Sequence, residues 1–142
     1  MSIVATSYMA AQAITASKLL EGRGVDAEVI DLRSISPWDQ DSVLCSVRKT
    51  GCLVVADAAW KTCGVASEIA ASVAEQAFDD LHAPITRVCL PDTPAPSSAP
   101  LERAYYTGAE DIVQAVERVV EQKEKTWGTG SRSLIQKRIT AD

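Results

Sequence analysis

Short apolar runs alternate along this chain with segments of helical periodicity, and this alternation constrains the fold more than any other feature. The runs at residues 3–5, 27–32, 52–56 and 85–90 have the length and β-branched content of buried strands. Helical patterns occupy residues 9–21, 36–50, 64–78 and 109–122. Strands joined by helices of this length make right-handed crossovers, so the sequence predicts a three-layer α/β/α sandwich. We expect a mainly parallel sheet in which the four runs, numbered along the chain, lie in the order 2-1-3-4.

One segment predicts the start of a helix, and another predicts a connection without regular secondary structure. Ser36 is followed by Pro37, and this pair predicts a helix that Ser36 caps and in which Pro37 takes the first position. Residues 91–100 hold four prolines and two serines, so we expect an extended connection along the surface there.

The charge of the chain divides into an acidic body and a basic end. Residues 1–122, which we expect to form one domain, hold nine Lys or Arg and seventeen Asp or Glu. An acidic body argues against nucleic acid as a partner. Residues 123–142 hold five basic and two acidic residues, and we predict a tail that either is flexible or docks only through Trp127 and the pair Leu134 and Ile135.

The sequence shows neither a membrane-spanning segment nor a metal-binding motif. No apolar stretch reaches about 18 residues and no signal peptide is visible, which predicts a cytoplasmic protein without a membrane partner. The four cysteines lack a C-x-x-C pair, and a single histidine, His82, does not complete a metal-ligand set. We expect reduced cysteines, a solvated His82 and no metal site.

Residues 22–27 match the dinucleotide-binding pattern G-x-G-x-x-[GA], but in the wrong structural context. That motif requires glycines that follow a strand and open a helix, so that backbone N–H groups face a pyrophosphate. Here Gly22 and Gly24 close a helix and precede a strand. We interpret them as a helix cap.

The segment from Asp57 to Gly64 is the best candidate for a site. It leaves the carboxyl end of the third strand and enters a helix, which is where open α/β sheets bind ligands. Lys61, Thr62 and the first N–H groups of that helix could hold an anion, although an interface or structural role is the competing interpretation. The candidate ligand or interface residues are Ser7, Tyr8, Asp57, Trp60, Lys61, Thr62 and Gly64. The serines lack a G-x-S-x-G elbow, so no residue is predicted to be catalytic.

Three stretches taken together resemble a known family. They are Asp-Leu-Arg-Ser-Ile-Ser-Pro-Trp-Asp at 31–39, Ser-Val-Arg-Lys-Thr-Gly at 46–51 with Trp-Lys-Thr-Cys-Gly-Val at 60–65, and Pro-Asp-Thr-Pro-Ala-Pro at 91–96 with Glu-Asp-Ile-Val at 110–113. Their order is similar to the transketolase C-terminal domain, in particular that of the β subunit of pyruvate, branched-chain and acetoin dehydrogenases. The resemblance covers residues 3–120.

This resemblance implies a domain that assembles a thiamine-diphosphate-dependent oxidoreductase and is not active alone. In such enzymes thiamine diphosphate and Mg lie between other domains, so no catalytic, cofactor-binding or metal residue transfers to this chain. The implied partners are a second copy in a homodimer, the thiamine-binding domains or subunits, and the lipoyl acyltransferase core. The family has an extra antiparallel strand before the equivalent of Ile3, and its absence predicts a bare sheet edge beside residues 27–32.

Two other hypotheses stay open from the sequence. One is a free-standing regulatory module that binds a small anion at the mouth of the sheet through Lys61 and Thr62. The other keeps the resemblance but assigns the domain to a transketolase or a deoxyxylulose-phosphate synthase. The family often has an acidic residue in place of Ala58 and a glycine in place of Ala66, and both differences weaken the case for a shared ligand site.

Overall fold

Four parallel strands form the centre of the molecule. The computed structural model describes the backbone of residues 1–139 and the side chains of residues 1–125. The strands are β1 (Ser2–Thr6), β2 (Glu28–Leu32), β3 (Leu53–Trp60) and β4 (Thr86–Leu90). They pair in the order β2-β1-β3-β4, which confirms the predicted order. In the described sheet β2 is an edge strand that pairs with β1 alone.

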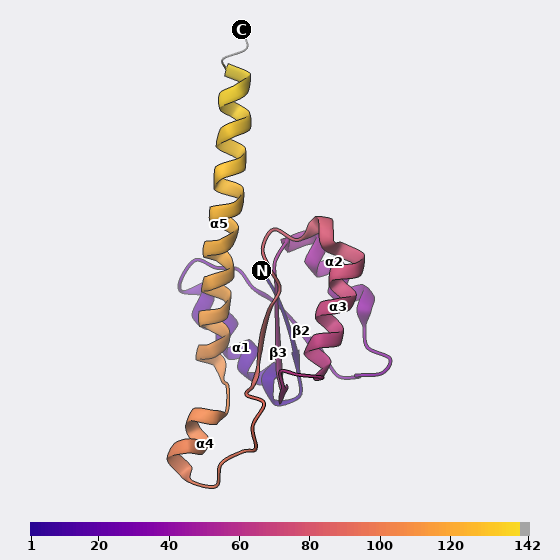
Figure 1. The fold of residues 1–142 in the computed structure, drawn as a ribbon, viewed down its shortest axis with the longest axis vertical. Helices are drawn as coiled ribbons and strands as arrows, with labels where there is room; N and C mark the ends of the chain where they lie inside the picture. The colour runs from indigo at the N-terminus through magenta and orange to yellow at the C-terminus, as the bar shows by residue number, and fades with distance from the viewer. Residues whose placement is uncertain (140–142) are drawn as a thin grey trace.

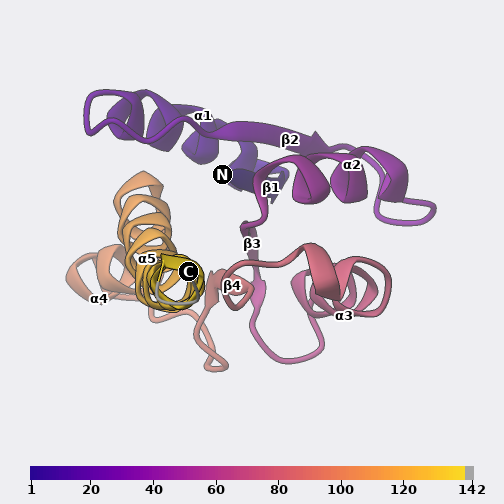
Figure 2. The same ribbon diagram turned by 90° about the horizontal axis from the view of Figure 1, so that it is seen from above.

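Helices cover both faces of this sheet. Helices α1 (Tyr8–Glu21) and α5 (Ala109–Ile139) lie on one side, and α2 (Gln40–Thr50) and α3 (Val65–Ala77) lie on the other (Figure 2). A short 3-10 turn, η1 (Phe78–Asp80), follows α3. The structure is therefore the predicted three-layer α/β/α sandwich.

Alternation along the strands divides the core into two parts. Ile3, Ala5 and Val54 belong to the cluster beneath α1 and α5, whereas Val4 and Val55 belong to the cluster beneath α2 and α3. Side chains on a strand alternate between the two faces, so a strand buried on both faces is apolar throughout. This explains why the predicted strands appear in the sequence as continuous apolar runs.

The start of α2 differs from the prediction. The helix begins at Gln40, and Asp39 caps it by accepting a hydrogen bond from the backbone N–H of Ser42 at 3.1 Å. Ser36 and Pro37 lie before the helix, and the peptide bond between them is cis. Ser and Asp cap helices about equally well, and here Asp39 is the residue whose side chain reaches the N–H of Ser42.

The connection after β4 is not extended throughout. A short helix, α4 (Ala99–Tyr105), follows it, with Pro100 in its first turn. Proline fits that position because N–H groups of the first turn have no partner within a helix. The prolines before Ala99 do lie in irregular structure.

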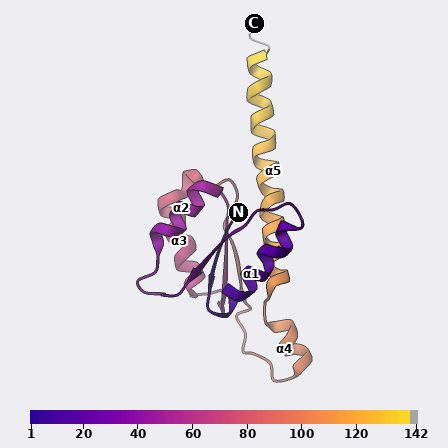
Figure 3. The same cartoon turned by 180° about the vertical axis from the view of Figure 1, so that it is seen from behind.

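The last helix is longer than the sequence pattern predicts. Helix α5 continues past Gln122 to Ile139 and extends beyond the sheet (Figures 1 and 3). Among its described side chains, Val119 is the last that is buried in the core, and Lys123 Nζ donates to the carbonyl of Thr50 at 3.5 Å. The predicted contacts of Trp127, Leu134 and Ile135 lie outside the described side chains.

Glycines serve helix ends at two positions. Gly24, with φ 78°, turns the chain after α1, whereas Gly22 keeps a right-handed helical conformation. Gly51, with φ 71°, ends α2, and its carbonyl accepts from the backbone N–H of His82 at 2.7 Å. His82 is therefore half-buried against Gly51 and is not the solvated side chain that we predicted.

Within the described residues, no helix has the length and apolar content needed to cross a bilayer. All four cysteines are free thiols, with Cys45 and Cys63 exposed and Cys52 buried. Burial raises the pKa of the Cys52 thiol.

Candidate functional site

The candidate residues gather where β1 and β3 end. These neighbouring strands lead to helices on opposite faces, α1 after β1 and α3 after β3, so a crevice forms at their carboxyl ends. We call this end of the sheet the carboxyl edge. It lies at the bottom of the molecule in Figure 1, next to α4.

Asp57 is the buried charged residue of this edge. Strand β3 continues past the predicted end at Ala56, so Asp57 lies within the strand and is only 6% exposed. Thr6 Oγ1, at the end of β1, donates to Asp57 Oδ1 at 2.7 Å. Asp57 Oδ2 has no hydrogen-bond partner among the described residues. Half of this carboxylate is thus anchored and half is unsatisfied.

A cavity of about 550 Å³ opens beside Asp57, and we call it the switch-point cavity. Polar residues from the ends of three strands line it together with small and apolar ones. The lining residues are Thr6, Ser7, Asp31, Leu32, Arg33, Ile35, Asp57, Ala58 and Ala59. Arg33 Nε donates to Asp31 Oδ2 at 3.0 Å, so these two lining charges compensate each other.

Ser7 has an unusual backbone at the rim of this cavity. Its φ of 48° and ψ of −127° lie in a region that side chains with a Cβ rarely adopt. The residue turns the chain from β1 into α1, but its side chain makes no capping hydrogen bond. The exposed Ser7 hydroxyl therefore stays available to a ligand.

The loop between β3 and α3 is held by an internal carboxylate. Asp92, which follows β4, accepts from the backbone N–H of Thr62 at 3.0 Å and from Thr62 Oγ1 at 2.6 Å. These two hydrogen bonds lower the pKa of Asp92 below its ordinary value. The donors that we assigned to an anion at Thr62 are therefore already occupied. Arg87 also supports this loop, through the carbonyl of Lys61 at 2.9 Å.

A second cavity, of about 440 Å³, lies beyond Ala58 and Ala59. Trp60, Thr62, Cys63, Gly64 and Leu90 complete its lining. A Cβ on Gly64 would collide with the carbonyl oxygen of Trp60, so this position requires glycine. The same Cβ would lie 3.6 Å from Asp57 Oδ2, which places the unsatisfied oxygen close to the start of α3.

Trp60 connects this edge to α4. Its Nε1 donates to the hydroxyl of Tyr105 at 3.2 Å, and that hydroxyl donates to the carbonyl of Thr93 at 2.8 Å. Tyr105 and Tyr106 meet edge to face, with ring centroids 5.2 Å apart. Although its nitrogen is bonded, Trp60 is still 52% exposed.

Exposed apolar side chains are concentrated at the carboxyl edge. Among the described side chains, eight large hydrophobic ones are exposed, and five of these lie at or after the carboxyl ends of strands. The five are Tyr8, Ile35, Trp60, Leu101 and Tyr106, which we call the apolar rim. Aromatic residues exposed in this way are typical of protein interfaces.

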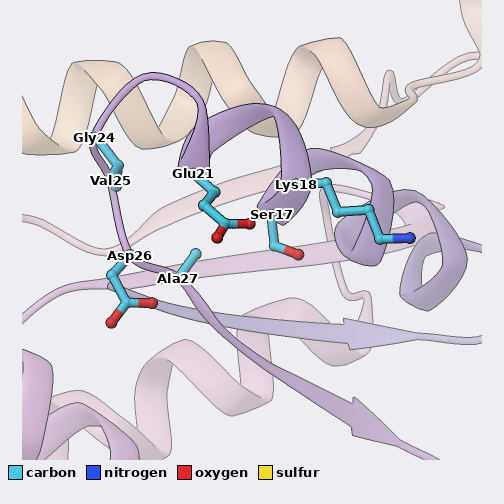
Figure 4. A pocket seen from close by; sticks show the side chains of 7 residues that line it. All are labelled: Ser17, Lys18, Glu21, Gly24, Val25, Asp26 and Ala27. Atoms are coloured by element: carbon cyan, nitrogen blue, oxygen red, sulfur yellow. The ribbon is translucent and has the colours of Figure 1, made fainter.

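A further cavity, of about 430 Å³, lies at the opposite end of α1 (Figure 4). It includes Gly24 and the carboxylates of Glu21 and Asp26. A helix C-terminus presents carbonyl groups, and with two carboxylates it disfavours a pyrophosphate. This arrangement agrees with the interpretation of Gly22 and Gly24 as a cap.

The structure separates the predicted site residues into two groups. Ser7 and Asp57 line the switch-point cavity, and Trp60, Thr62 and Gly64 line the second one. Tyr8 and Lys61 line neither of these two cavities. Sequence reasoning missed Thr6 and Asp92, although each follows a predicted strand within two residues. In the described part of the chain, no group of three His, Cys, Asp or Glu side chains could hold a metal ion.

Comparisons with known proteins all find similarity to transketolase-type enzymes. The model of the transketolase C-terminal domain matches residues 1–112. The β subunit of acetoin:2,6-dichlorophenolindophenol oxidoreductase from Cupriavidus necator is 44% identical over 119 residues, which are 84% of this chain and 35% of that subunit. The mitochondrial pyruvate dehydrogenase E1 component subunit beta of Dictyostelium discoideum is 38% identical over 121 residues, which are 85% of this chain and 34% of that protein.

A solved structure gives the same result. A split gene transketolase, an inactive beta4 tetramer, superposes with a TM-score of 0.75 and 32% identity over 86% of this chain and 39% of that chain. The chain thus spans about a third of the length of the curated relatives that it matches.

Proposed function

This chain belongs to the transketolase C-terminal domain family, and from that premise we propose that it is a non-catalytic assembly domain of a thiamine-diphosphate-dependent 2-oxo acid dehydrogenase. In this proposal other domains of the enzyme bind thiamine diphosphate and Mg. The described chain supplies a folded surface that holds them, or a second copy of itself, in place.

The apolar rim is the observation that carries this proposal. Its members come from α1, β3, α4 and the connections after β2 and α4, yet each of them lies at or after the carboxyl end of a strand. Trp and Tyr are the residues most often found at the energetic centre of protein interfaces. An exposed rim of this kind, rather than an internal pocket with catalytic groups, is suited to binding another polypeptide.

The relatives favour the dehydrogenase assignment over a transketolase. The acetoin and pyruvate enzyme subunits are 44% and 38% identical to the chain, whereas the split gene transketolase is 32% identical. Both named dehydrogenase relatives are β subunits, so the companion of this domain is expected to be a polypeptide of the same enzyme. A lipoyl acyltransferase core is a further expected partner.

The anion-binding hypothesis receives less support. Asp92 occupies the donors of Thr62, and the buried Asp57 carboxylate would repel an anion at the mouth of the sheet. A panel of phosphate and nucleotides should therefore leave the melting temperature unchanged, and Lys61→Ala should make no difference to that result.

Light scattering after size-exclusion chromatography tests the assembly proposal. The chain is expected to form a homodimer or a complex with the thiamine-binding domain of its enzyme, and Trp60→Ser should weaken that association by about tenfold or more. Phe78→Ser is the matched control, because Phe78 is 72% exposed but lies at the end of α3, away from the apolar rim.

Two kinds of result would contradict the proposal, failure to associate and activity or cofactor binding by the chain alone. One is a chain that stays monomeric at high concentration and binds no domain of a thiamine-dependent enzyme. The other is turnover of any 2-oxo acid by the purified chain alone, or measurable binding of thiamine diphosphate to it by calorimetry.

A further inference from the structure

Asp57 is a buried carboxylate of which only one oxygen has a hydrogen-bond partner among the described residues, although the other lies close to the start of α3. The residue is 6% exposed, its Oδ1 accepts from Thr6, and its Oδ2 has no partner among the described residues. Buried carboxylates in folded proteins normally have their oxygens hydrogen-bonded, since an unsatisfied one is costly. This half-satisfied carboxylate marks a position that a hydrogen-bond donor would stabilise.

The charges around the switch-point cavity favour a positively charged donor. Arg33 is already paired with Asp31 at 3.0 Å, and no ion pair joins Asp57 to any described Lys or Arg. The charged residues of the lining are therefore two carboxylates, Asp31 and Asp57, and one guanidinium, Arg33. A cation would balance the second carboxylate, whereas an anion would meet Asp57 directly.

The remaining lining selects an organic cation over a metal ion. Leu32, Ile35, Ala58 and Ala59 give the cavity apolar walls, and the described residues hold no cluster of three acidic, His or Cys ligands. Divalent cations require several oxygen ligands, which this lining does not gather. An alkyl stem with a terminal ammonium or guanidinium group fits both the apolar walls and the carboxylate.

We propose that the switch-point cavity binds an organic cation, an ammonium or guanidinium group on an apolar stem, which pairs with Asp57. The exposed Ser7 hydroxyl at the rim supplies a further acceptor for its N–H groups. The cation comes either from a lysine or arginine side chain of a companion polypeptide or from a free small amine. This assignment does not depend on the proposed assembly role. It adds to that role only if the cation is a lysine or arginine side chain of a companion polypeptide.

Isosteric probes test the chemistry directly. N-acetyl-arginine amide and N-acetyl-citrulline amide have nearly the same shape, but only the first is charged. Titrating each into the ¹⁵N-labelled full chain should shift the backbone amide signals of Thr6, Ser7 and Ala58 with the arginine probe. The citrulline probe should bind at least about tenfold more weakly, since it lacks the charge-assisted hydrogen bond.

Two variants locate the binding. Asp57→Asn keeps the shape and the Thr6 hydrogen bond but removes the charge, and it should weaken binding of the arginine probe about tenfold. Ala58→Leu fills the cavity from its exposed rim without touching the carboxylate, and it should abolish the shifts even if the Asn variant does not fold. Asp41→Asn, an exposed residue on α2, is the control that should change nothing.

Equal binding of the two probes, or arginine binding that survives both Asp57→Asn and Ala58→Leu, would overturn the assignment. The source of the cation follows from a second measurement. If a companion polypeptide supplies it, Asp57→Asn weakens the assembled complex. If a free amine supplies it, the complex is unaffected while butylamine, but not butanol, reproduces the arginine shifts. A chain that binds the arginine probe yet never assembles would remove the assembly role and leave this cation site standing.

Discussion

Gly51 and Gly24 share a backbone conformation but have different surroundings. Both have positive φ, 71° and 78°, in the left-handed region. A Cβ on Gly24 would meet nothing within 4 Å, whereas a Cβ on Gly51 would collide with the ring of His82. A side chain at Gly24 would therefore cost free energy only through its backbone conformation, whereas one at Gly51 would add the cost of the steric clash with His82.

We predict that Gly24→Ala lowers the free energy of unfolding by about 1–2 kcal/mol, which is the usual cost of a left-handed residue with a Cβ. Gly51→Ala should lower it further, because the His82 ring must also move. Urea denaturation of both variants measures the difference. The added cost should shrink when Gly51→Ala is compared in a His82→Ala background, and equal losses for the two alanine variants would show that His82 does not pack as described.

Asp92 makes the loop between β3 and α3 sensitive to acid. Its pKa lies below the ordinary value of 3.8 because Thr62 donates two hydrogen bonds to the carboxylate. A group with a lowered folded-state pKa stabilises the folded state above the unfolded pKa and loses that effect as the pH falls through the folded value.

We therefore expect the amide signal of Thr62 to stay constant above pH 5 and to shift only as the pH falls below 3.8, when Asp92 gains a proton. An NMR titration of the amide chemical shifts measures this transition. In Asp92→Asn the pH-dependent step should disappear while the signals of distant helices remain. A Thr62 signal that titrates in the wild-type chain and in Asp92→Asn alike would assign the effect to another group.

At the scale of elements, the periodic pattern of apolar residues predicted the longer helices, the strands and their order. It missed features that depend on contacts between residues far apart in the sequence. The strand order and the two helical layers follow from alternating apolar runs, and both are confirmed. The end of β3 was placed too early because Asp57 looks unfavourable in a strand. Thr6, a residue 51 positions away, satisfies half of that side chain. No local pattern contains such a partner.

The candidate site was predictable to the same extent. Ser7 and Asp57 line the same cavity because the parallel strands β1 and β3 end at the same edge of the sheet, and the strand order is enough to predict this. Asp92 was missed because its role depends on the direction of a side chain after β4, and α4 was missed because seven residues with an early proline give little periodicity. The positions of strand ends are thus readable from sequence, while the contacts between them are not.

Helix α2 offers a direct test of its own start. Asp39 accepts from both the backbone N–H and the hydroxyl of Ser42, and these bonds lower the pKa of Asp39. Asp39→Ala should lower the melting temperature because the first turn loses its cap, whereas Ser36→Ala should leave it unchanged. Differential scanning fluorimetry compares the two, and the reverse order would restore Ser36 as the cap.

At the scale of the whole molecule, the described core occupies only the early part of the last helix. Among the side chains that the structure describes on α5, the buried ones run from Ile112 to Val119, and the backbone of the helix continues to Ile139. We expect a chain truncated after Lys125 to unfold at the same denaturant midpoint as the full chain, since every described core residue and the Lys123 contact with Thr50 remain. Circular dichroism should show less helix. A lower midpoint would mean that the removed residues pack on the body.

The direction of α5 also determines which end of the protein stays accessible when the chain is attached to a surface by a terminus. The helix starts at Ala109 beside the carboxyl edge and rises about 1.5 Å per residue, so its 31 residues span roughly 46 Å and end far from the switch-point cavity. Met1 lies at that opposite end of the sheet as well, because β1 begins there. Tethering the chain to a sensor chip by either terminus would leave Trp60 and the switch-point cavity on the side away from the chip, where the analyte flows. A dye on Tyr8→Cys would report from that same side.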